Sequence, residues 1–279
     1  MTLMNISSID EITKNYDALI FDIWGVVYEG HNPYENAVNF INKMIRLNKK
    51  VIFLSNAPRP GILSYQRFVD WGINMNNVHV YTSGDQLREE LINKNNERFK
   101  DPTLKFYHLG SERNQDLLAN IDINITNDIK QANFLLLSLY VDEDENIQPY
   151  DDILKEAINL KLPAICANPD LTVNYNNKIR YCSGSFAKKY TELNGIVHYY
   201  GKPESRIFNL ILNRYLSDYD RSKILMIGDT IETDIVGAKQ VDIDSALVLT
   251  GNGQKYLNNQ NAFKDCQAKP TWVSYGIGY

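Results

Sequence analysis

Two segments of the sequence place carboxylates directly after apolar runs. One run leads into Asp22, with Gly25 three residues later, and another leads into Asp229, with Asp234 in the helical segment that comes next. A glycine so close to Asp22 permits a sharp turn, so that backbone N–H groups can face an anion. Carboxylates spaced like Asp229 and Asp234 suit Mg²⁺, although each aspartate alone could instead cap a turn or a helix.

Two further segments offer groups that bind phosphoryl oxygens. FLSNAP carries Ser55 and Asn56 at the end of an apolar run, and YGKPES carries Lys202 before a helical segment. A hydroxyl and an amide are neutral donors, while a lysine can neutralise both a phosphate and an attacking carboxylate. Taken singly, the Ser-Asn pair could be an ordinary turn and the lysine could be solvated.

The elements that must position these residues alternate between strands and helices. Short apolar runs, rich in β-branched or aromatic residues, are each followed by an amphipathic segment: DALIFDIW by ENAVNFINKMIRL, KVIFLSN by ILSYQRFVDWG, and KILMIGD by TDIVGAKQV, with SALVLTG near the end. This alternation predicts parallel βαβ units. The nearly continuous apolar runs predict central strands, so their polar ends should meet at the carboxyl edge of one sheet, where ligands bind.

A long stretch between Asn56 and Lys202 exceeds what one or two crossovers of that sheet require. Within it, KFYHLG, NFLLLSLY and PAICANP predict strands, and DDILKEAINL predicts a helix. We therefore expect an inserted α/β domain at about 90–196 and a core domain formed by 1–89 and 197–279, with boundaries uncertain by about ten residues.

Composition excludes several classes of protein. Hydrophobic residues make up 44% and charged residues 23%, which is typical of a folded globular chain, and the formal net charge of -5 includes no basic stripe that would bind nucleic acid. No run approaches eighteen apolar residues and the N-terminal residues lack a signal-peptide pattern, so we expect a cytoplasmic protein with no membrane partner. The three widely spaced cysteines predict reduced thiols.

In this order the four segments resemble the haloacid dehalogenase (HAD) superfamily: an aspartate after the first strand, a serine after the second, a lysine before a helix, and G-D-x-x-x-x-D. The long insert, the sequence GDTIETDI and the segment ANPD at 167–170 resemble its class IIA branch. The resemblance implies an α/β fold, a HAD-like doubly wound parallel sheet (Rossmann-like core) with an inserted α/β cap domain of the C2 type.

The resemblance also implies a magnesium-dependent phosphatase that acts on a small phosphorylated metabolite. Asp22 would be the nucleophile and form an aspartyl-phosphate that water cleaves. Mg²⁺ would lie between Asp22, the backbone carbonyl of Trp24 and Asp229, with Asp234 close by or bound through water.

The remaining implied roles concern the substrate. Ser55, Asn56 and Lys202 would hold the transferring phosphoryl group, with Lys202 counted among the catalytic residues. Asn168 and Asp170, in the expected cap, would face the rest of the substrate.

One position departs from the family's phosphatases, which carry a second aspartate where this chain has Trp24. An indole cannot exchange a proton near neutral pH, so the acid/base role is vacant unless Glu29 or His31 in the same loop replaces it. We therefore expect turnover to favour substrates with acidic leaving groups. Trp24 could pack and close the site, or stack on substrate.

Three other interpretations are weighed against this one. A phospho-ligand binder without turnover would retain the metal site. A response-regulator-like receiver is disfavoured by the chain length and by the late position of the second acidic pair, and dinucleotide binding by the absence of G-x-G-x-x-G after the first strand. The identity of the substrate and the oligomeric state, with a homodimer among the options, stay open.

Overall fold

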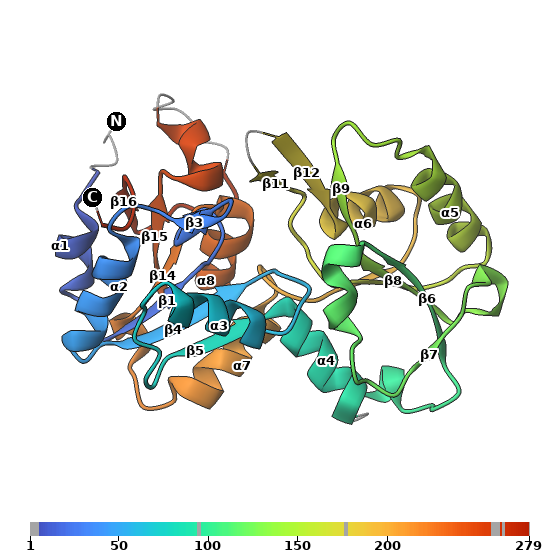
Figure 1. The fold of residues 1–279 in the computed structure, drawn as a ribbon, viewed down its shortest axis with the longest axis horizontal. Coiled ribbons are helices and arrows are strands. Elements are labelled where there is room, and N and C mark those ends of the chain that lie inside the picture. Colours follow the sequence, from blue (N-terminus) through green and yellow to red (C-terminus); the bar gives the residue numbers. More distant parts are fainter. Residues whose placement is uncertain (1–5, 94–95, 176–177, 258–262, 264–265, 279) are drawn as a thin grey trace. The chain divides into compact units, whose positions relative to one another are not determined.

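The computed structural model describes residues 6–93, 96–175, 178–257, 263 and 266–278. The chain divides into two units (Figure 1). The first unit comprises Met1–Ser55, Gly61–Tyr81 and Lys202–Tyr279, and the second comprises Asn56–Pro60 and Thr82–Gly201. The second unit thus begins and ends a few residues outside the expected 90–196 and also takes in a short piece that lies after the second strand of the core.

The first unit is built on a six-stranded sheet with the order β16-β15-β14-β1-β4-β5. β1 pairs in parallel with both β14 and β4, and β14, β15 and β16 continue in parallel. The strands are β1 (Ala18–Phe21), β4 (Lys50–Ser55), β5 (His79–Thr82), β14 (Ile224–Gly228), β15 (Asp244–Val248) and β16 (Trp272–Ser274). A two-stranded hairpin, β2 (Tyr28–Glu29) and β3 (Asn32–Pro33), comes after β1.

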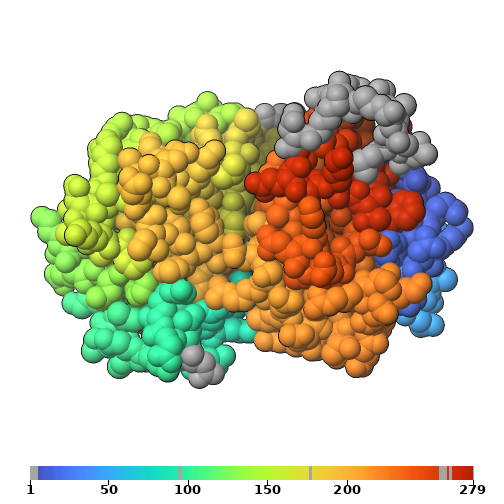
Figure 2. Space-filling model, turned by 180° about the vertical axis from the view of Figure 1, so that it is seen from behind, coloured from blue at the N-terminus to red at the C-terminus, as the bar shows by residue number. Residues whose placement is uncertain are grey.

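Both faces of this sheet are covered, which explains the uninterrupted apolar run of β1. Leu19 and Phe21 belong to one hydrophobic cluster, whereas Ala18 and Ile20 belong to another, because successive side chains of a strand point to opposite faces. Helix α2 packs into the first cluster and α7 into the second. Residues of α7 and the segment after it, orange in Figure 2, cover much of the visible face of the first unit.

The helical segments of the first unit lie between its strands. They are α1 (Ile9–Thr13), α2 (Ala37–Arg46), α3 (Ile62–Asp70), α7 (Ser205–Tyr215), η4 (Arg221–Lys223), η5 (Ile231–Ile235), α8 (Val236–Gln240) and η6 (Gly251–Tyr256). Helix α2 buries Ala37, Phe40, Ile41 and Met44, the spacing of one helix face. The expected helix after Asp229 begins as a turn of π-helix, η5, which continues as α8.

The second unit has a parallel five-stranded sheet of its own, with the order β13-β10-β8-β6-β7. A three-stranded antiparallel sheet has the order β11-β12-β9. The strands are β6 (Lys105–Gly110), β7 (Asn124–Ile125), β8 (Phe134–Ser138), β9 (Tyr140–Asp142), β10 (Ala164–Cys166), β11 (Thr172–Tyr175), β12 (Lys178–Cys182) and β13 (Val197–Tyr199). The expected single strand NFLLLSLY is therefore two strands, β8 and β9.

Helices cover both faces of this second parallel sheet as well. Leu135 and Leu137 of β8 lie in a cluster with α5 and α6, whereas Phe134 and Leu136 lie in a cluster with α4. The helical segments are α4 (Ser83–Asn93), η1 (Glu97–Phe99), η2 (Glu112–Leu117), η3 (Ile129–Gln131), α5 (Gln148–Asn159) and α6 (Ser183–Glu192). The predicted α/β fold with parallel sheets is confirmed. Across the described residues, every helix is too short or too polar to cross a membrane.

Candidate active site

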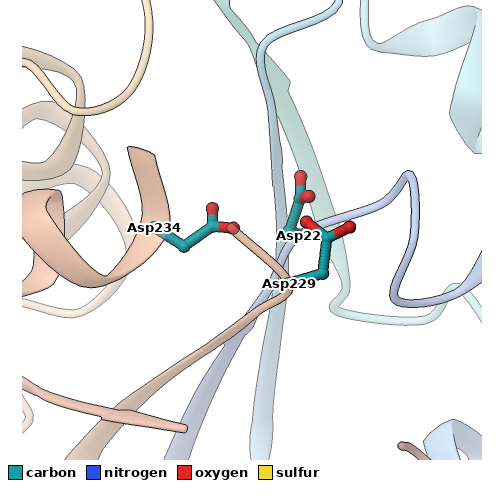
Figure 3. Close-up of side chains that lie close together, drawn as sticks. All are labelled: Asp22, Asp229 and Asp234. Atoms are coloured by element: carbon teal, nitrogen blue, oxygen red, sulfur yellow. The ribbon is translucent and has the colours of Figure 1, made fainter. Parts of the chain in front are cut away.

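Two carboxylates meet at the carboxyl edge of the first unit's sheet because their strands are neighbours. β1 and β14 pair in parallel with Phe21 opposite Ile227, and the Asp22 amide donates to the Ile227 carbonyl at 2.8 Å. Asp22 comes directly after β1 and Asp229 directly after β14, so their side chains leave the sheet side by side (Figure 3). Carboxylate oxygens of Asp22, Asp229 and Asp234 all lie within 4.8 Å of one another, and all three residues are buried.

The third carboxylate, Asp234, comes from η5 and is held by the turn before it. The Thr230 amide donates to Asp234 Oδ2 at 3.1 Å. Gly228 is required beneath it, since a Cβ at that position would come within 2.2 Å of the Asp234 carboxylate. The π-helical turn therefore brings a side chain from the start of a helix back to the strand end.

Lys202 joins two of these carboxylates. Its Nζ lies 2.6 Å from Asp22 Oδ1 and 2.6 Å from Asp234 Oδ1, and it also donates to the Leu54 carbonyl at 3.1 Å. Only 1% of Lys202 is exposed to solvent. A buried ammonium group needs anions and hydrogen-bond acceptors around it, and here two aspartates supply the negative charge while the Leu54 carbonyl supplies a further acceptor.

The cluster carries an excess of negative charge. Together, the three carboxylates and the one ammonium group carry a net charge of −2 when all four groups are ionised. Burial, together with Asp22 and Asp234, raises the pKa of Asp229 well above its usual range. Burial also raises the pKa of Asp234 to about 7, against the opposing effect of Lys202. A divalent cation would relieve this repulsion, and oxygen ligands of this kind suit Mg²⁺, so the residues present fit a metal ion.

Asp229 is positioned by residues that sequence reasoning missed. Its Oδ1 accepts from the Thr230 hydroxyl at 2.8 Å, and its Oδ2 accepts from the Asn252 amide at 2.7 Å. A Cβ on either Gly25 or Gly251 would come within about 2 Å of Oδ2, so both positions must be glycine. The G-N-G motif at 251–253 is the sequence feature that could have indicated this contact. Its first glycine allows the backbone to approach the Asp229 carboxylate closely.

The Trp24 side chain packs against a neighbouring aromatic ring. It is half-buried, and its ring lies edge-on to Tyr28 with centroids 5.1 Å apart. Glu29, one of the two alternative proton donors, accepts a hydrogen bond from the Tyr34 hydroxyl at 2.9 Å. His31, the other, is exposed.

The expected phosphoryl- and substrate-binding residues fall in both units. Ser55 is the buried last residue of β4 in the first unit. In the second unit the Asn56 side-chain amide donates to Asp170 Oδ1 at 2.8 Å, and Asn168 Oδ1 accepts from the Asp170 amide at 2.9 Å. Ser83 donates to the carbonyls of Asn56 and Ala167, which fastens the two segments together. The structure thus brings Asn56, Asn168 and Asp170 together.

All three cysteines are free thiols, as the sequence predicted. Cys166 and Cys182 are buried, and burial raises the pKa of the Cys166 thiol to about 12. Such thiols are protonated and unreactive near neutral pH.

Two family models match this chain. One, described as haloacid dehalogenase-like hydrolase, matches residues 19–124, and the other, described as HAD-hydrolase-like, matches residues 199–274. An acid sugar phosphatase of Staphylococcus saprophyticus is 24% identical over 242 residues, which cover 85% of this chain and 88% of that protein.

Several solved structures share the fold of this protein over almost its whole length. A haloacid dehalogenase-like hydrolase from Brucella suis has a TM-score of 0.80 and 26% identity, covering 97% of this chain and 98% of its own. A protein from Cytophaga hutchinsonii, described as a possible sugar phosphatase, has a TM-score of 0.75 and 23% identity, covering 99% of each chain. With the carboxylate and lysine cluster at the sheet edge, these matches place the chain in the haloacid dehalogenase superfamily of hydrolases.

Proposed function

We propose that this enzyme is a magnesium-dependent phosphatase of the class IIA branch, with the second unit as its C2-type cap. Its substrate would be a phosphomonoester of a small metabolite. The acid sugar phosphatases among its relatives support this assignment, as does the oxygen-rich cluster of the first unit.

The observation that carries the proposal is the position of Lys202. A buried ammonium lies 2.6 Å from Asp22 Oδ1 and 2.6 Å from Asp234 Oδ1, and such a neighbouring cation favours the ionised form of a carboxylate. An ionised carboxylate can act as a nucleophile, whereas a protonated one cannot. The same ammonium can neutralise an incoming phosphate, which Asp22 alone would repel.

The reaction would proceed in two steps on these residues. Asp22 attacks phosphorus, the bond from phosphorus to the leaving oxygen breaks, and the phosphoryl group becomes attached to the Asp22 carboxylate. Lys202 and the Ser55 hydroxyl stabilise the phosphoryl oxygens, and water then cleaves the aspartyl-phosphate to release inorganic phosphate. Asp22, the Trp24 carbonyl, Asp229 and Asp234 would hold Mg²⁺, which supplies positive charge to the phosphoryl oxygens when it is bound.

Trp24 determines which leaving groups this enzyme accepts. The indole offers no exchangeable proton near neutral pH, and a positioned general acid is typically worth about 10²- to 10⁴-fold in rate. Esters of ordinary alcohols need that proton because alkoxides leave poorly. Aryl phosphates, acyl phosphates and anhydrides need it less, so they should be cleaved faster.

Phosphate release tests the proposal directly. Aryl, acyl, sugar and nucleotide phosphates are supplied with Mg²⁺ to the native protein, to Asp22→Asn and to Trp24→Asp, with Trp24→Phe as the matched control. We expect turnover that requires Asp22, faster cleavage of aryl and acyl phosphates than of sugar phosphates, and a gain of about 10²-fold on sugar phosphates in Trp24→Asp alone. Equal rates on aryl and sugar phosphates, or no gain in Trp24→Asp, would refute the role of Trp24.

A second candidate is a phospho-ligand binder without turnover, and the surroundings of Trp24 favour it. The Glu29 carboxylate accepts from Tyr34 and His31 is exposed, so neither lies ready as a substitute acid. A binder would show a rise in melting temperature with Mg²⁺ and orthovanadate, together with no phosphate release from any member of the panel.

A further inference from the structure

Asn252, in the first turn of η6, is connected to the Asp229 carboxylate by two routes. Its backbone amide donates to Asp229 Oδ2 at 2.7 Å. Its side-chain amide donates to the Thr230 hydroxyl at 2.9 Å, and that hydroxyl donates to Asp229 Oδ1 at 2.8 Å. An ionised carboxylate can only accept hydrogen bonds, so the direction of each of these bonds is fixed. One residue therefore orients both oxygens of the carboxylate, one directly and the other through Thr230.

The backbone that carries Asn252 is held independently of its side chain. The Thr250 hydroxyl donates to the Gly25 carbonyl at 2.5 Å, and the Gly253 amide donates to the Thr250 carbonyl at 2.8 Å. The backbone amide of Asn252 should therefore keep its place if the side chain is shortened. The route to Asp229 Oδ1 can thus be removed while the route to Oδ2 remains.

The two oxygens of Asp229 have different surroundings. Oδ2 lies against the backbones of Gly25 and Gly251, where an added Cβ would come within 2.0 Å and 2.1 Å of it, and it also accepts from the Asn252 amide. Oδ1 accepts from the Thr230 hydroxyl, which occupies one of its lone pairs. The enclosure of Oδ2 favours Oδ1 as the oxygen that meets a cation, with the Thr230 hydroxyl setting the direction of the remaining lone pair.

Asp234 is restrained on both of its oxygens as well. Oδ1 lies 2.6 Å from Lys202 Nζ, and Oδ2 accepts from the Thr230 amide at 3.1 Å. Mg²⁺ requires nearly ideal octahedral geometry with short bonds to oxygen, whereas Ca²⁺ accepts irregular geometry and more ligands. Carboxylates restrained in this way suit Mg²⁺ better, because they cannot spread apart to surround the larger ion.

We propose that Asn252 is a positioning residue that sets the affinity of the metal site and its preference for Mg²⁺ over Ca²⁺, acting through Thr230 on Asp229. This inference rests on the proposed magnesium-dependent function and deepens it, since it assigns the choice of cation to a residue outside the set of metal ligands. Removal of a partner that orients a metal ligand typically costs about 10- to 100-fold in metal affinity.

Calorimetric titration of Mg²⁺ and of Ca²⁺ into the metal-free protein tests the proposal. We expect the Kd for Mg²⁺ to rise about 10-fold in Asn252→Ala and in Thr230→Val, and the Kd for Ca²⁺ to rise less, so that the preference for Mg²⁺ falls. Thr230→Ser retains the hydroxyl and should retain the preference. Gln254→Ala is the matched control, because Gln254 is an exposed residue of the same η6.

Melting temperatures in EDTA distinguish positioning from a purely structural role. A structural role would lower the melting temperature of Asn252→Ala and leave the ratio of its two Kd values at the wild-type value, which would refute the proposal. A wild-type protein that binds Ca²⁺ as tightly as Mg²⁺ would refute it too.

Hydrolysis of p-nitrophenyl phosphate by the wild-type enzyme with Mg²⁺ tests the phosphatase function separately. If phosphate is released and the Kd ratio of Asn252→Ala equals that of the wild type, the role of Asn252 is refuted and the phosphatase function stands. If the ratio falls as expected and no ester in the panel is hydrolysed, the role of Asn252 stands and the phosphatase function fails.

Discussion

The two units of this molecule share an architecture and differ in the side chains at the ends of their strands. Each has a parallel sheet covered by helices on both faces. In the first unit, β1 and β14 run into Asp22 and Asp229. In the second, β6, β8 and β10 end at Gly110, Ser138 and Cys166, which carry no charge. The sheet supplies a common edge in both units, and the side chains at that edge decide whether it can support phosphoryl chemistry.

The polar side chains at the strand ends of the two sheets have different partners. In the second unit the Ser138 hydroxyl and His108 Nε2 lie 2.7 Å apart as a hydrogen-bonded pair. In the first unit Lys202 contacts Asp22 and Asp234, and burial together with the neighbouring carboxylates raises the pKa of Asp229 and of Asp234. Perturbed titration of this kind is typical of active sites, which supports the proposal that the chemistry takes place in the first unit.

Replacing the polar residue at each edge should give the sharpest contrast. Asp22→Asn should lower kcat/KM for p-nitrophenyl phosphate by about 10³-fold or more, because an amide cannot form the acyl phosphate. Ser138→Ala, at the edge of the other sheet, should lower the melting temperature and change kcat/KM by no more than about twofold. Similar losses of activity in both variants would remove the distinction between the units.

Removal of Lys202 should be the largest effect on stability. Lys202→Met leaves Asp22 and Asp234 buried without their cation, which typically costs about 3 to 5 kcal/mol of unfolding free energy. Lys223→Met is the matched control, since Lys223 is exposed and its ammonium group donates to the Asn15 carbonyl rather than to a buried carboxylate. Urea denaturation at pH 7 in EDTA measures both variants, and a loss of less than about 1 kcal/mol for Lys202→Met would show that the carboxylates do not depend on it.

The first unit without metal should lose stability as pH rises. The pKa of Asp234 is raised to about 7 and that of Asp229 is also raised, so the folded chain retains protons that the unfolded chain releases above about pH 4. The unfolding free energy contributed by these groups is therefore greatest below pH 4 and falls as pH rises toward 7.

Magnesium should reverse this trend because it binds the ionised carboxylates. At one fixed concentration, about 100 times its Kd at pH 7.5, it should add about 2.7 kcal/mol at pH 7.5 and less at pH 5.5, where protons compete for the carboxylates and the Kd is higher. Melting temperatures at both pH values, with EDTA and with Mg²⁺, measure the effect, and Asp234→Asn should weaken the trend seen in EDTA. A larger gain from Mg²⁺ at pH 5.5 would contradict this account.

The parallel fold was predictable from the sequence because its signals are local. The apolar runs that became β1, β4 and β14 and the helical spacing of α2 each lie within one short segment. The convergence of Asp22 and Asp229 was also predictable from a general rule, since parallel strands end at the same edge. The chemical role expected for each of these residues stays a prediction.

Contacts between distant segments could not be predicted in the same way. The Asn56 amide reaches Asp170 across 114 positions, a contact that no local pattern indicates, while its expected role toward a phosphoryl oxygen stays a prediction. The strand before Lys202, β13, joins the sheet of the second unit, while the lysine side chain reaches Asp22 in the first. A local pattern specifies that a strand forms, whereas the sheet that it joins depends on long-range pairing.

The second unit should show a small pH dependence of the opposite sign. Burial lowers the pKa of His108, so below its usual pKa the unfolded chain binds a proton that the folded chain resists. Stability from this group is therefore present above about pH 6.5 and is lost as pH falls. With Mg²⁺ present to suppress the contribution of the first unit, the urea midpoint should fall from pH 7.5 to pH 5.5 by less in His108→Gln than in the wild type. His31→Gln, which alters an exposed histidine, should behave as the wild type does, and an identical fall in all three proteins would mean that His108 makes no difference to this trend.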